Sequence, residues 1–337
     1  MLWKAGLAIL LGSTIGHTFG QSLTTSAPTD GRCVALNQTA MTQVANGKLK
    51  EAELALAAFL ASGADQVQPA CAGLVLNNMA ALMSVSGRSE DGARLAEQAA
   101  QALEKVYSPN DPVLLHPLQI LASASFELGM IGKAREAFKR MRSIRIQRPE
   151  DHALLYGMAA ALSEAEGRLP EAEANYLAAL QEWQKAGRGE TAEAGAIISG
   201  LGSLYLKEHR LSEARQALDR ALAIFGSAKD AVSMDRLKLL KVRGVLQAWQ
   251  GDWQGAEQDL HDALTMADRE RWVDPLTLRA LLNSYADVLR RNHHRQEARS
   301  IEARAAAIHV DSKAAAIVDI TELLPKAKQV KKRPPAR

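Results

Sequence analysis

The sequence predicts an all-α protein, a right-handed α-solenoid of about seven helix-turn-helix repeats. One observation is a phrase of the form Gly-x-x-x-Glu-Ala, seen at 47–52 and 167–172, whose looser copies recur about every forty residues along the chain. The other is that apolar and polar residues show no sustained period-two alternation, so no strand signal competes with helix. Helical hairpins of this size cannot bury their apolar faces alone, so neighbouring hairpins are expected to stack.

Each repeat can be aligned on one small residue, which we call the anchor. The seven anchors are Ala52, Gly92, Ala134, Ala172, Ala214, Ala256 and Ala298. Twelve residues before each anchor stands another Ala or Gly: Ala40, Ala80, Ala122, Ala160, Gly202, Gly244 and Ala286. Small residues at both positions let two antiparallel helices approach to about 8 Å. The alignment therefore predicts a close helix crossing inside every repeat.

Five residues before each anchor, the sequence predicts the tight turn between the two helices. The residues there are Gly47, Gly87, Gly129, Gly167, His209, Gly251 and His293. Gly suits a left-handed helix cap because it lacks Cβ, and His is a tolerated replacement. Four residues after the anchors, bulky side chains should fill the space beside the crossing: Leu56, Phe138, Tyr176, Leu218 and Leu260. Glu302 breaks this column in the last repeat, as a solvent-facing terminal cap should.

The ends of the chain differ from the repeats. Residues 1–20 have the three-part layout of a secretory signal peptide, with an apolar run that is too short to span a membrane. We expect a cleaved signal, with an uncleaved anchor as the alternative, and hence an exported protein, periplasmic or secreted. Residues 21–32 read as a flexible leader, 33–312 as the solenoid and 313–337 as a C-terminal segment with a basic disordered tail. No transmembrane segment is expected in the mature chain.

Positive and negative charges nearly balance over the whole chain, but basic residues are concentrated at its C-terminal end. The chain has 41 Lys and Arg against 38 Asp and Glu, a formal net charge of +3. Residues 326–337 contain six basic residues and no acidic one. Such a block is usually solvated, and the functional alternative is contact with an anionic surface. Nucleic acid is not expected as a partner, because no aromatic residues accompany the basic cluster and the signal peptide points to export.

The repeats resemble a known family. Leu201-Gly202-Ser203-Leu204-Tyr205, followed by Ala214, Leu218 and Ala221, is similar to the tetratricopeptide repeat (TPR) pattern. The period of about 42 residues and the phrase Leu76-Asn77-Asn78-Met79-Ala80 are more similar to the longer repeats of kinesin light chain. The resemblance implies that first helices line a concave face on which an extended peptide lies. It implies fold more strongly than function, since such arrays serve unrelated assemblies.

A peptide groove is the expected functional site. Fifteen residues before the anchors the first helices carry Asn37, Asn77, Gln119, Gly157, Ser199, Lys241 and Asn283, six of them polar. Side chains of this kind can pair with a peptide backbone whatever its sequence, although an ordinary solvated helix face would look the same. Further candidate groove residues are Asn78, Ser203, Lys207, Trp249, Asp287, Arg290 and Arg291.

The expected partner of this groove is a protein or peptide, and the charge of the groove favours an acidic one. Lys207, Lys241 and the pair Arg290 and Arg291 make the groove basic toward its C-terminal end, which favours an acidic segment or a free carboxylate. The alternative is that these charges only keep the chain soluble. Trp249 could act as an aromatic anchor in the groove, whereas Trp253 is expected in the core.

The two cysteines stand at the starts of neighbouring first helices. Cys33 and Cys71 could therefore meet, and an oxidising compartment would preserve the bond. A disulfide would join the first repeat to the second and stabilise the fold by about 2–4 kcal/mol. Two buried free thiols are the alternative.

No motif for catalysis, cofactor binding or metal binding is present in the sequence. We therefore expect no enzyme and no cofactor, but an exported scaffold that binds a partner protein or an extended peptide in the groove. The alternatives are a tether to the envelope surface through the basic tail, and a helical appendage to an enzyme encoded elsewhere.

Overall fold

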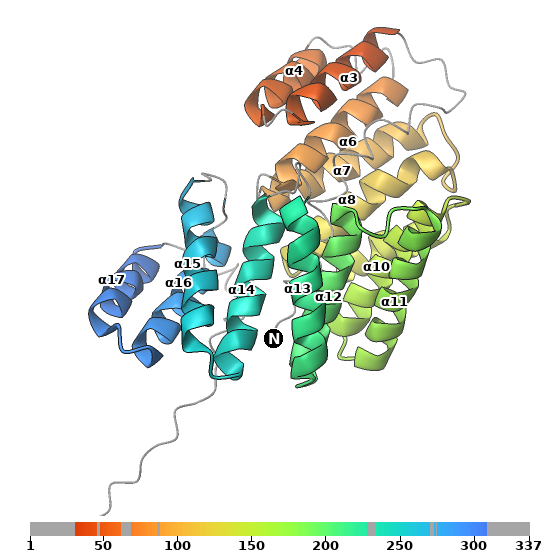
Figure 1. The fold of residues 1–337 in the computed structure, drawn as a ribbon. Helices are drawn as coiled ribbons and strands as arrows, with labels where there is room; N and C mark the ends of the chain where they lie inside the picture. The colour runs from red at the N-terminus through yellow and green to blue at the C-terminus, as the bar shows by residue number, and fades with distance from the viewer. Residues whose placement is uncertain are drawn as a thin grey trace, which may run out of the picture.

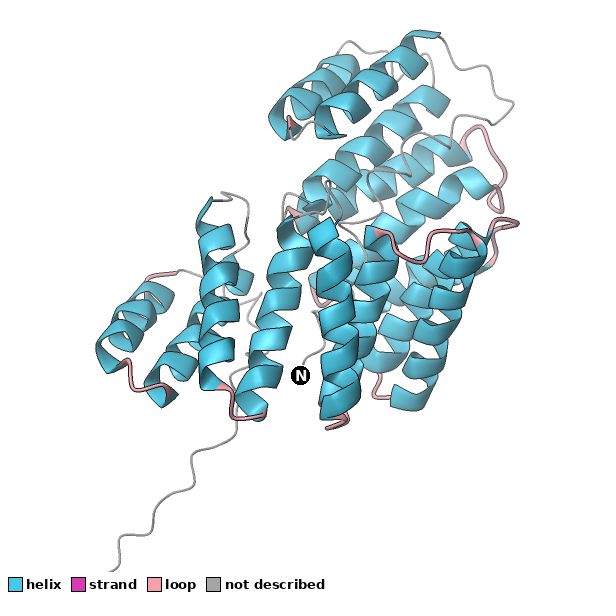
Figure 2. Cartoon of the chain, viewed as in Figure 1, coloured by secondary structure: helices cyan, strands magenta, loops and turns pink. Residues whose placement is uncertain are grey.

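The computed structural model describes residues 31–45, 48–61, 69–85, 88–227, 233–269, 273 and 275–308. Fourteen α-helices and one 3₁₀ helix make up these ranges, and no strand occurs within them (Figure 2). The all-α prediction is confirmed. The predicted signal peptide and the predicted basic tail lie outside the described residues, and α3 begins at Gly31, inside the range expected for the leader.

The helices pack as seven consecutive hairpins, each made of a first and a second helix. The pairs are α3 (Gly31–Ala45) with α4 (Leu49–Ala61), α6 (Pro69–Val85) with α7 (Ser89–Glu104), α8 (Leu115–Glu127) with α9 (Ile131–Arg142), α10 (Pro149–Ala165) with α11 (Leu169–Lys185), α12 (Ala192–Lys207) with α13 (Leu211–Ser227), α14 (Ser233–Trp249) with α15 (Trp253–Arg269), and α16 (Pro275–Arg291) with α17 (Arg295–Ala306). The short helix η2 (Pro112–Leu114) precedes α8. The predicted series of stacked hairpins is thus present.

The turns inside the hairpins lie where the sequence placed them. The described turn residues all have left-handed backbones, with φ of 75° at Gly129, 76° at Gly167, 58° at His209, 80° at Gly251 and 69° at His293. Gly47 and Gly87 lie outside the described residues. In all seven turns the next residue donates its N–H to the carbonyl five positions back, at 2.8–2.9 Å. This bond is that of a Schellman cap, which satisfies a carbonyl at the end of the first helix.

Small residues sit at the helix crossings, as the alignment predicts. The anchors and the residues twelve positions before them are buried in every hairpin. A Cβ added to Gly202 would lie 2.8 Å from Leu218 Cγ, and one added to Gly244 would lie 3.0 Å from Leu260 Cγ. Because the bulky residue of the second helix fills this space, the first helix can carry only the smallest side chain there.

The hairpins follow a curved path from α3 to α17 (Figure 1). The first helix of each hairpin contacts the first helix of the next one, from α3 through to α16. The buried apolar residues divide into two clusters, of which the larger runs from the first hairpin to α14 and the smaller from α14 to α17. Helix α14 contributes to both, with Val242 in one and Leu240 in the other. Of the described helices, none combines the length and the apolar character needed to cross a membrane.

The helix crossing yields a prediction about stability. Gly202→Val should lower the free energy of unfolding by about 1–3 kcal/mol, because the added atoms would collide with Leu218. Gly132→Ala is the matched control, since nothing lies within 4 Å of the Cβ it would add. That control should be neutral or gain up to about 1 kcal/mol. Urea titrations followed by circular dichroism measure both, and equal midpoints for the two variants would contradict the crossing.

Candidate functional site

The candidate site is a stripe of residues on the first helices of hairpins two to seven. We call it the inner face and define it as the residues that lie eighteen, fifteen, eleven, eight or seven positions before each anchor. Successive offsets differ by three or four residues, with eight and seven both lying one turn after eleven, so these side chains share one side of each helix. Two contacts between different hairpins show that these sides face one another.

The first of these contacts joins hairpins that are not neighbours. Lys238 is the sixth residue of α14, and its Nζ is 3.5 Å from a carboxylate oxygen of Glu127 at the end of α8. In a straight stack with helices about 10 Å apart, α8 and α14 would be separated by roughly 30 Å. The solenoid is therefore strongly curved, with its first helices turned inward. Glu127 also accepts a hydrogen bond of 2.6 Å from the Ser89 hydroxyl at the start of α7.

The second contact is a buried charge network between hairpins four and five. Glu164 of α10 and Lys207 of α12 form an ion pair whose side chains are only 3% and 10% exposed. The Tyr176 hydroxyl donates a 2.8 Å hydrogen bond to the same carboxylate. Burial, and then the nearby Glu164 charge, raise the pKa of Tyr176 well above its usual value, so the phenol stays a donor. A Cβ on Gly200 would lie 2.9 Å from the tyrosine ring, which explains the glycine there.

Several predicted amides pair with each other. The Asn78 amide donates a 2.6 Å hydrogen bond to Asn37 Oδ1, and both side chains are buried between the first two hairpins. This pair links two repeats, so Asn37 and Asn78 act in packing here. Gln119 is also buried, while Asn77, Lys241 and Asn283 are partly exposed. The predicted polar stripe is therefore more enclosed than a solvated helix face.

Polar atoms without a hydrogen-bond partner gather on the inner face. They are Asn77 Oδ1, His116 Nδ1, Ser123 Oγ, Ser199 Oγ and Trp249 Nε1, all shielded from solvent. Atoms of the same kind in Gln43, Ser125, Gln247 and Glu302 lie off this face. A buried polar group left unpaired costs about 1–3 kcal/mol, so a run of them on one surface calls for an explanation.

His116 is the titratable member of this group. Burial lowers the pKa of its imidazole, and the opposing charge of Asp151 does not reverse the shift. Asp151 is itself engaged by Arg148, which reaches both carboxylate oxygens at 2.7 and 3.0 Å. The imidazole is therefore neutral, and one ring nitrogen donates while the other accepts.

The basic end of the predicted groove is largely matched by acids. Besides Lys207 with Glu164, Arg290 is ion-paired with Asp287 and with Glu302. The Arg291 guanidinium lies over the Trp253 ring, 5.2 Å from its centre. The sequence alone did not predict that Lys207 pairs with Glu164 or Arg290 with Glu302, because these partners come from other helices.

Trp249 stacks on a turn residue of the preceding hairpin. Its ring centre is 4.7 Å from that of His209, with 25° between the planes. This contact gives the left-handed His209 a packing role that Gly could not supply. Trp253 is only partly buried and packs against the C-terminal core cluster.

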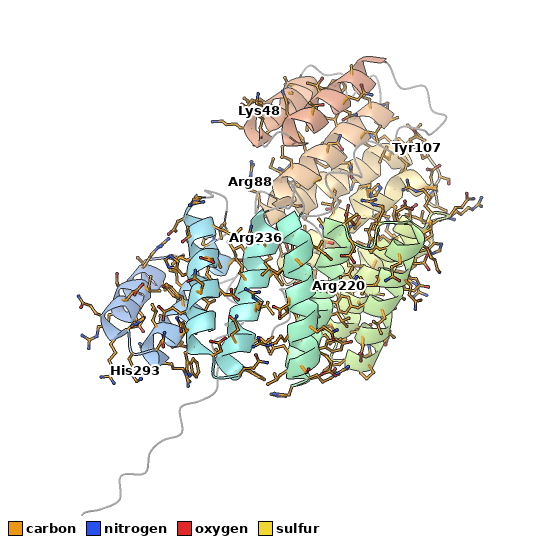
Figure 3. The ribbon with its side chains drawn as sticks, viewed as in Figure 1. Lys48, Arg88, Tyr107, Arg220, Arg236 and His293 are labelled. Carbon is orange, nitrogen blue, oxygen red and sulfur yellow. The ribbon has the colours of Figure 1, made fainter. Side chains whose placement is uncertain are left out.

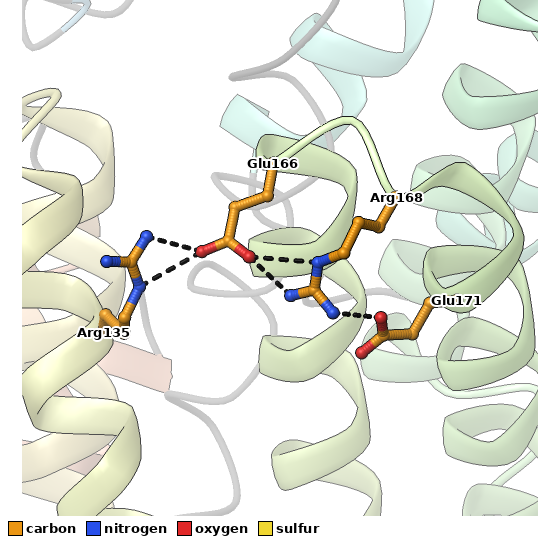
Figure 4. A network of polar contacts seen from close by, with 4 residues as sticks. All are labelled: Arg135, Glu166, Arg168 and Glu171. Carbon is orange, nitrogen blue, oxygen red and sulfur yellow. Dashed lines mark hydrogen bonds and ion pairs between the residues drawn. The ribbon is translucent and has the colours of Figure 1, made fainter.

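A polar ladder joins neighbouring repeats along the edge that carries the turns. Arg88 pairs with Glu53, Arg210 with Glu173, and His294 with Glu257. The turns at Arg88 and His293 are labelled in Figure 3. Between hairpins three and four, Arg135 and Arg168 both bind Glu166, and Arg168 also reaches Glu171 (Figure 4). These groups are mostly exposed, so each pair adds little to stability.

The cation of Arg168, followed by that of Arg135, lowers the pKa of the Glu166 carboxyl. The carboxylate is thus charged at neutral pH and holds both guanidinium groups at the hairpin boundary.

Sequence reasoning missed three residues of the inner face. His116 and Lys238 lie eighteen positions before their anchors, a column that the prediction did not use. Ser123 lies eleven before its own, where the prediction named Ser203 and Asp287 but not Ser123. The missing signal was helical periodicity, since residues three and four positions away along a helix share a face.

The cysteines bear on the link between the first two hairpins. Cys71 is 1% exposed at the start of α6 and is disulfide-bonded. The Cys33 side chain lies outside those that the structure describes, so the Cys33–Cys71 pairing stays a prediction. In the described part of the chain, no three His, Cys, Asp or Glu side chains gather as a metal site.

Part of the chain matches the model of a known repeat family. Residues 151–227, from α10 to α13, match the tetratricopeptide repeat model, which confirms the resemblance seen in the sequence. No curated protein sequence matches the chain at a significant level.

Solved structures show the same fold. BtubC (BKLC) from P. vanneervenii is 23% identical, with a TM-score of 0.52 over 65% of this chain and 90% of that chain. A Rap protein in complex with Competence and Sporulation Factor is 16% identical, with a TM-score of 0.57 over 84% of this chain and 76% of that chain. TPR-like repeats from Podosopora anserina, related by name to kinesin light chain, are 19% identical over 69% of this chain and 92% of that chain, with a TM-score of 0.34. The first two of these structures, together with the stacked hairpins described above, show a TPR-like solenoid.

The buried network predicts a non-additive effect on stability. Glu164→Gln should cost about 3–5 kcal/mol, because it leaves the buried Lys207 charge without its partner. The double variant Glu164→Gln with Lys207→Met should recover most of this loss, since no unpaired charge remains. Lys185→Met, which breaks an exposed pair with Glu182, is the control and should cost less than about 1 kcal/mol. Additive losses in guanidinium unfolding would refute the network.

Proposed function

We propose that this protein is a non-enzymatic scaffold that binds a partner protein, through an extended segment of that partner, along the inner face. The observation that carries the proposal is the set of unpartnered polar atoms in His116, Ser123 and Ser199. These side chains come from two first helices, α8 and α12, and occupy three different offsets of the inner face. Polar groups spread over more than one helix can be met together by an extended polypeptide, whose backbone offers N–H and C=O groups along its length.

The chemistry of these atoms fits a peptide backbone. A serine hydroxyl can donate or accept, a neutral imidazole does one at each nitrogen, and the Asn77 carbonyl oxygen accepts. Backbone N–H and C=O groups offer the complementary pair at every residue of a partner, whatever its sequence. Binding would therefore restore hydrogen bonds that the unbound protein lacks.

The charges support recognition through the backbone more than through partner acidity. Lys207, Lys238 and Arg290 each have a carboxylate partner within the chain. An acidic partner consequently remains a prediction from the sequence. The solved structure of a Rap protein bound to Competence and Sporulation Factor supports the fold of the proposal and does not define the ligand of this chain.

Export is a further part of the proposal and rests on residues 1–20 of the sequence. The scaffold would then work outside the cytoplasm, where the proposed Cys33–Cys71 bond is stable. The tether through residues 326–337 is the alternative function, and no described residue favours it.

Peptide binding by the unpartnered hydroxyls of the inner face is tested with peptides selected from a displayed library of random extended sequences. Ser123→Ala combined with Ser199→Ala should weaken binding of a selected peptide by about 5- to 100-fold, the loss of two hydrogen bonds. Fluorescence anisotropy measures the affinity, and circular dichroism should show unchanged helicity because both hydroxyls are unpaired in the free protein.

Three further variants serve as a control for the serine result and as tests of the amide side chains and of the tail. Ser212→Ala removes an exposed hydroxyl from a second helix and should leave affinity unchanged. Asn77→Ala with Asn283→Ala should weaken binding, whereas deletion of 326–337 should not. A library that yields no binder, or peptides that bind the double serine variant as tightly as the parent, would contradict the proposed function; binding lost only with the tail would favour the tether.

Export and the disulfide share one measurement. Protein recovered from the host's exported fraction should begin at Gln21, and its non-reduced peptide map should contain Cys33 joined to Cys71. Reduction should separate the two peptides and lower the unfolding free energy by about 2–4 kcal/mol. Cytoplasmic protein that still begins at Met1 would reject export. Alkylation of the thiols of both Cys33 and Cys71 without prior reduction would reject the disulfide.

A further inference from the structure

The ion pair between Glu127 and Lys238 differs from the others in what it connects. The remaining ion pairs among the described residues join groups within one hairpin or in adjacent hairpins. Glu127 and Lys238 are separated by hairpins four and five, and the two side chains are 18% and 14% exposed. This contact therefore spans the inner face from one side of the curve to the other.

The inner face is closed in this structure. Residues 115–126 of α8 and 193–206 of α12 are buried along their whole length, although a first helix in an open curve would expose its inward side. The hydroxyl oxygens of Ser123 and Ser199 are shielded from solvent on these same helices. A peptide can therefore reach these atoms only after the groups that cover α8 and α12 have moved.

We propose that the Glu127–Lys238 pair is a latch that holds the inner face closed, and that a partner must open it to bind. This inference rests on the proposed function, because the latch guards the same surface. It adds a conformational step that costs binding energy, so the apparent affinity equals the intrinsic affinity multiplied by the open fraction.

The geometry suits a reversible latch. At 3.5 Å the Nζ–O distance is longer than that of most other ion pairs in the chain, and both groups retain some contact with water. Such a pair contributes modestly and is weakened by salt. Opening does not leave Glu127 bare, since the Ser89 hydroxyl remains hydrogen-bonded to its other oxygen. Lys238 lies in the second turn of α14, and its long side chain is partly exposed and can turn toward water.

The test uses the full chain and two single variants that keep side-chain size. Glu127→Gln retains an oxygen that can accept from Ser89, and Lys238→Met retains the stem without the charge. Both should enlarge the radius of gyration in small-angle X-ray scattering without loss of helicity. The parent should expand in about 1 M NaCl, where the Debye length is about 3 Å, and the variants should not expand further.

Affinity supplies the second readout. A library-selected peptide should bind each variant about two- to fivefold more tightly, because the cost of breaking one partly exposed pair is gone. Arg304→Met is the matched control: it breaks an ion pair with Asp268 between α17 and α15, away from the inner face, and should change neither quantity. The charge swap Glu127→Lys with Lys238→Glu should restore the compact form.

The outcomes separate the latch from the proposed function. Variants as compact as the parent at all salt concentrations would overturn the latch, whether or not any peptide binds. Expansion with no peptide binding would leave the latch standing and overturn the scaffold. Binding that is tightened equally by Arg304→Met would also overturn the latch, because the effect would then follow from net charge alone.

Discussion

The structure depends on one constraint, the close crossing of two helices in every hairpin. Ala or Gly occupies both sides of each crossing, and the bulky residue four positions after the anchor fills what remains, as Leu218 does against Gly202. A left-handed turn residue makes this approach possible because it reverses the chain within a few residues. Stacking, curvature and the inward direction of the first helices all follow from repeating this unit.

The sequence predicted the features that are local. Turn positions, crossings and helix pairs depend on residues within one repeat, and even His209 and His293 adopt the left-handed backbone expected of glycine. The candidate site was predicted only in part, since the first helices and the column with Ser199 were found while His116 and Lys238 were missed. Contacts such as Glu127 with Lys238 depend on how curvature accumulates over several hairpins, which no single repeat encodes.

The inner face combines satisfied charges with unsatisfied dipoles. Glu164 is matched by Lys207 and Tyr176, whereas Ser123 and Ser199 keep hydroxyls with nothing to bind. A surface built only for stability would replace those serines with alanine, which is abundant on the same helices. The arrangement therefore makes sense as a surface whose hydrogen bonds are completed from outside, with charge pairs holding the frame in place.

The division of the apolar core into two clusters affects how local unfolding spreads along the array. Five hairpins share one cluster and the last two share another, so the C-terminal pair can fray while the rest of the array stays folded. Helix α14 is the hinge between these regimes, because Val242 and Leu240 anchor it in different clusters. Loosening of α16 and α17 would thus reach α14, the helix that carries Lys238, through the cluster that they share, and Lys238 is far along the chain from Glu127 but next to it in space.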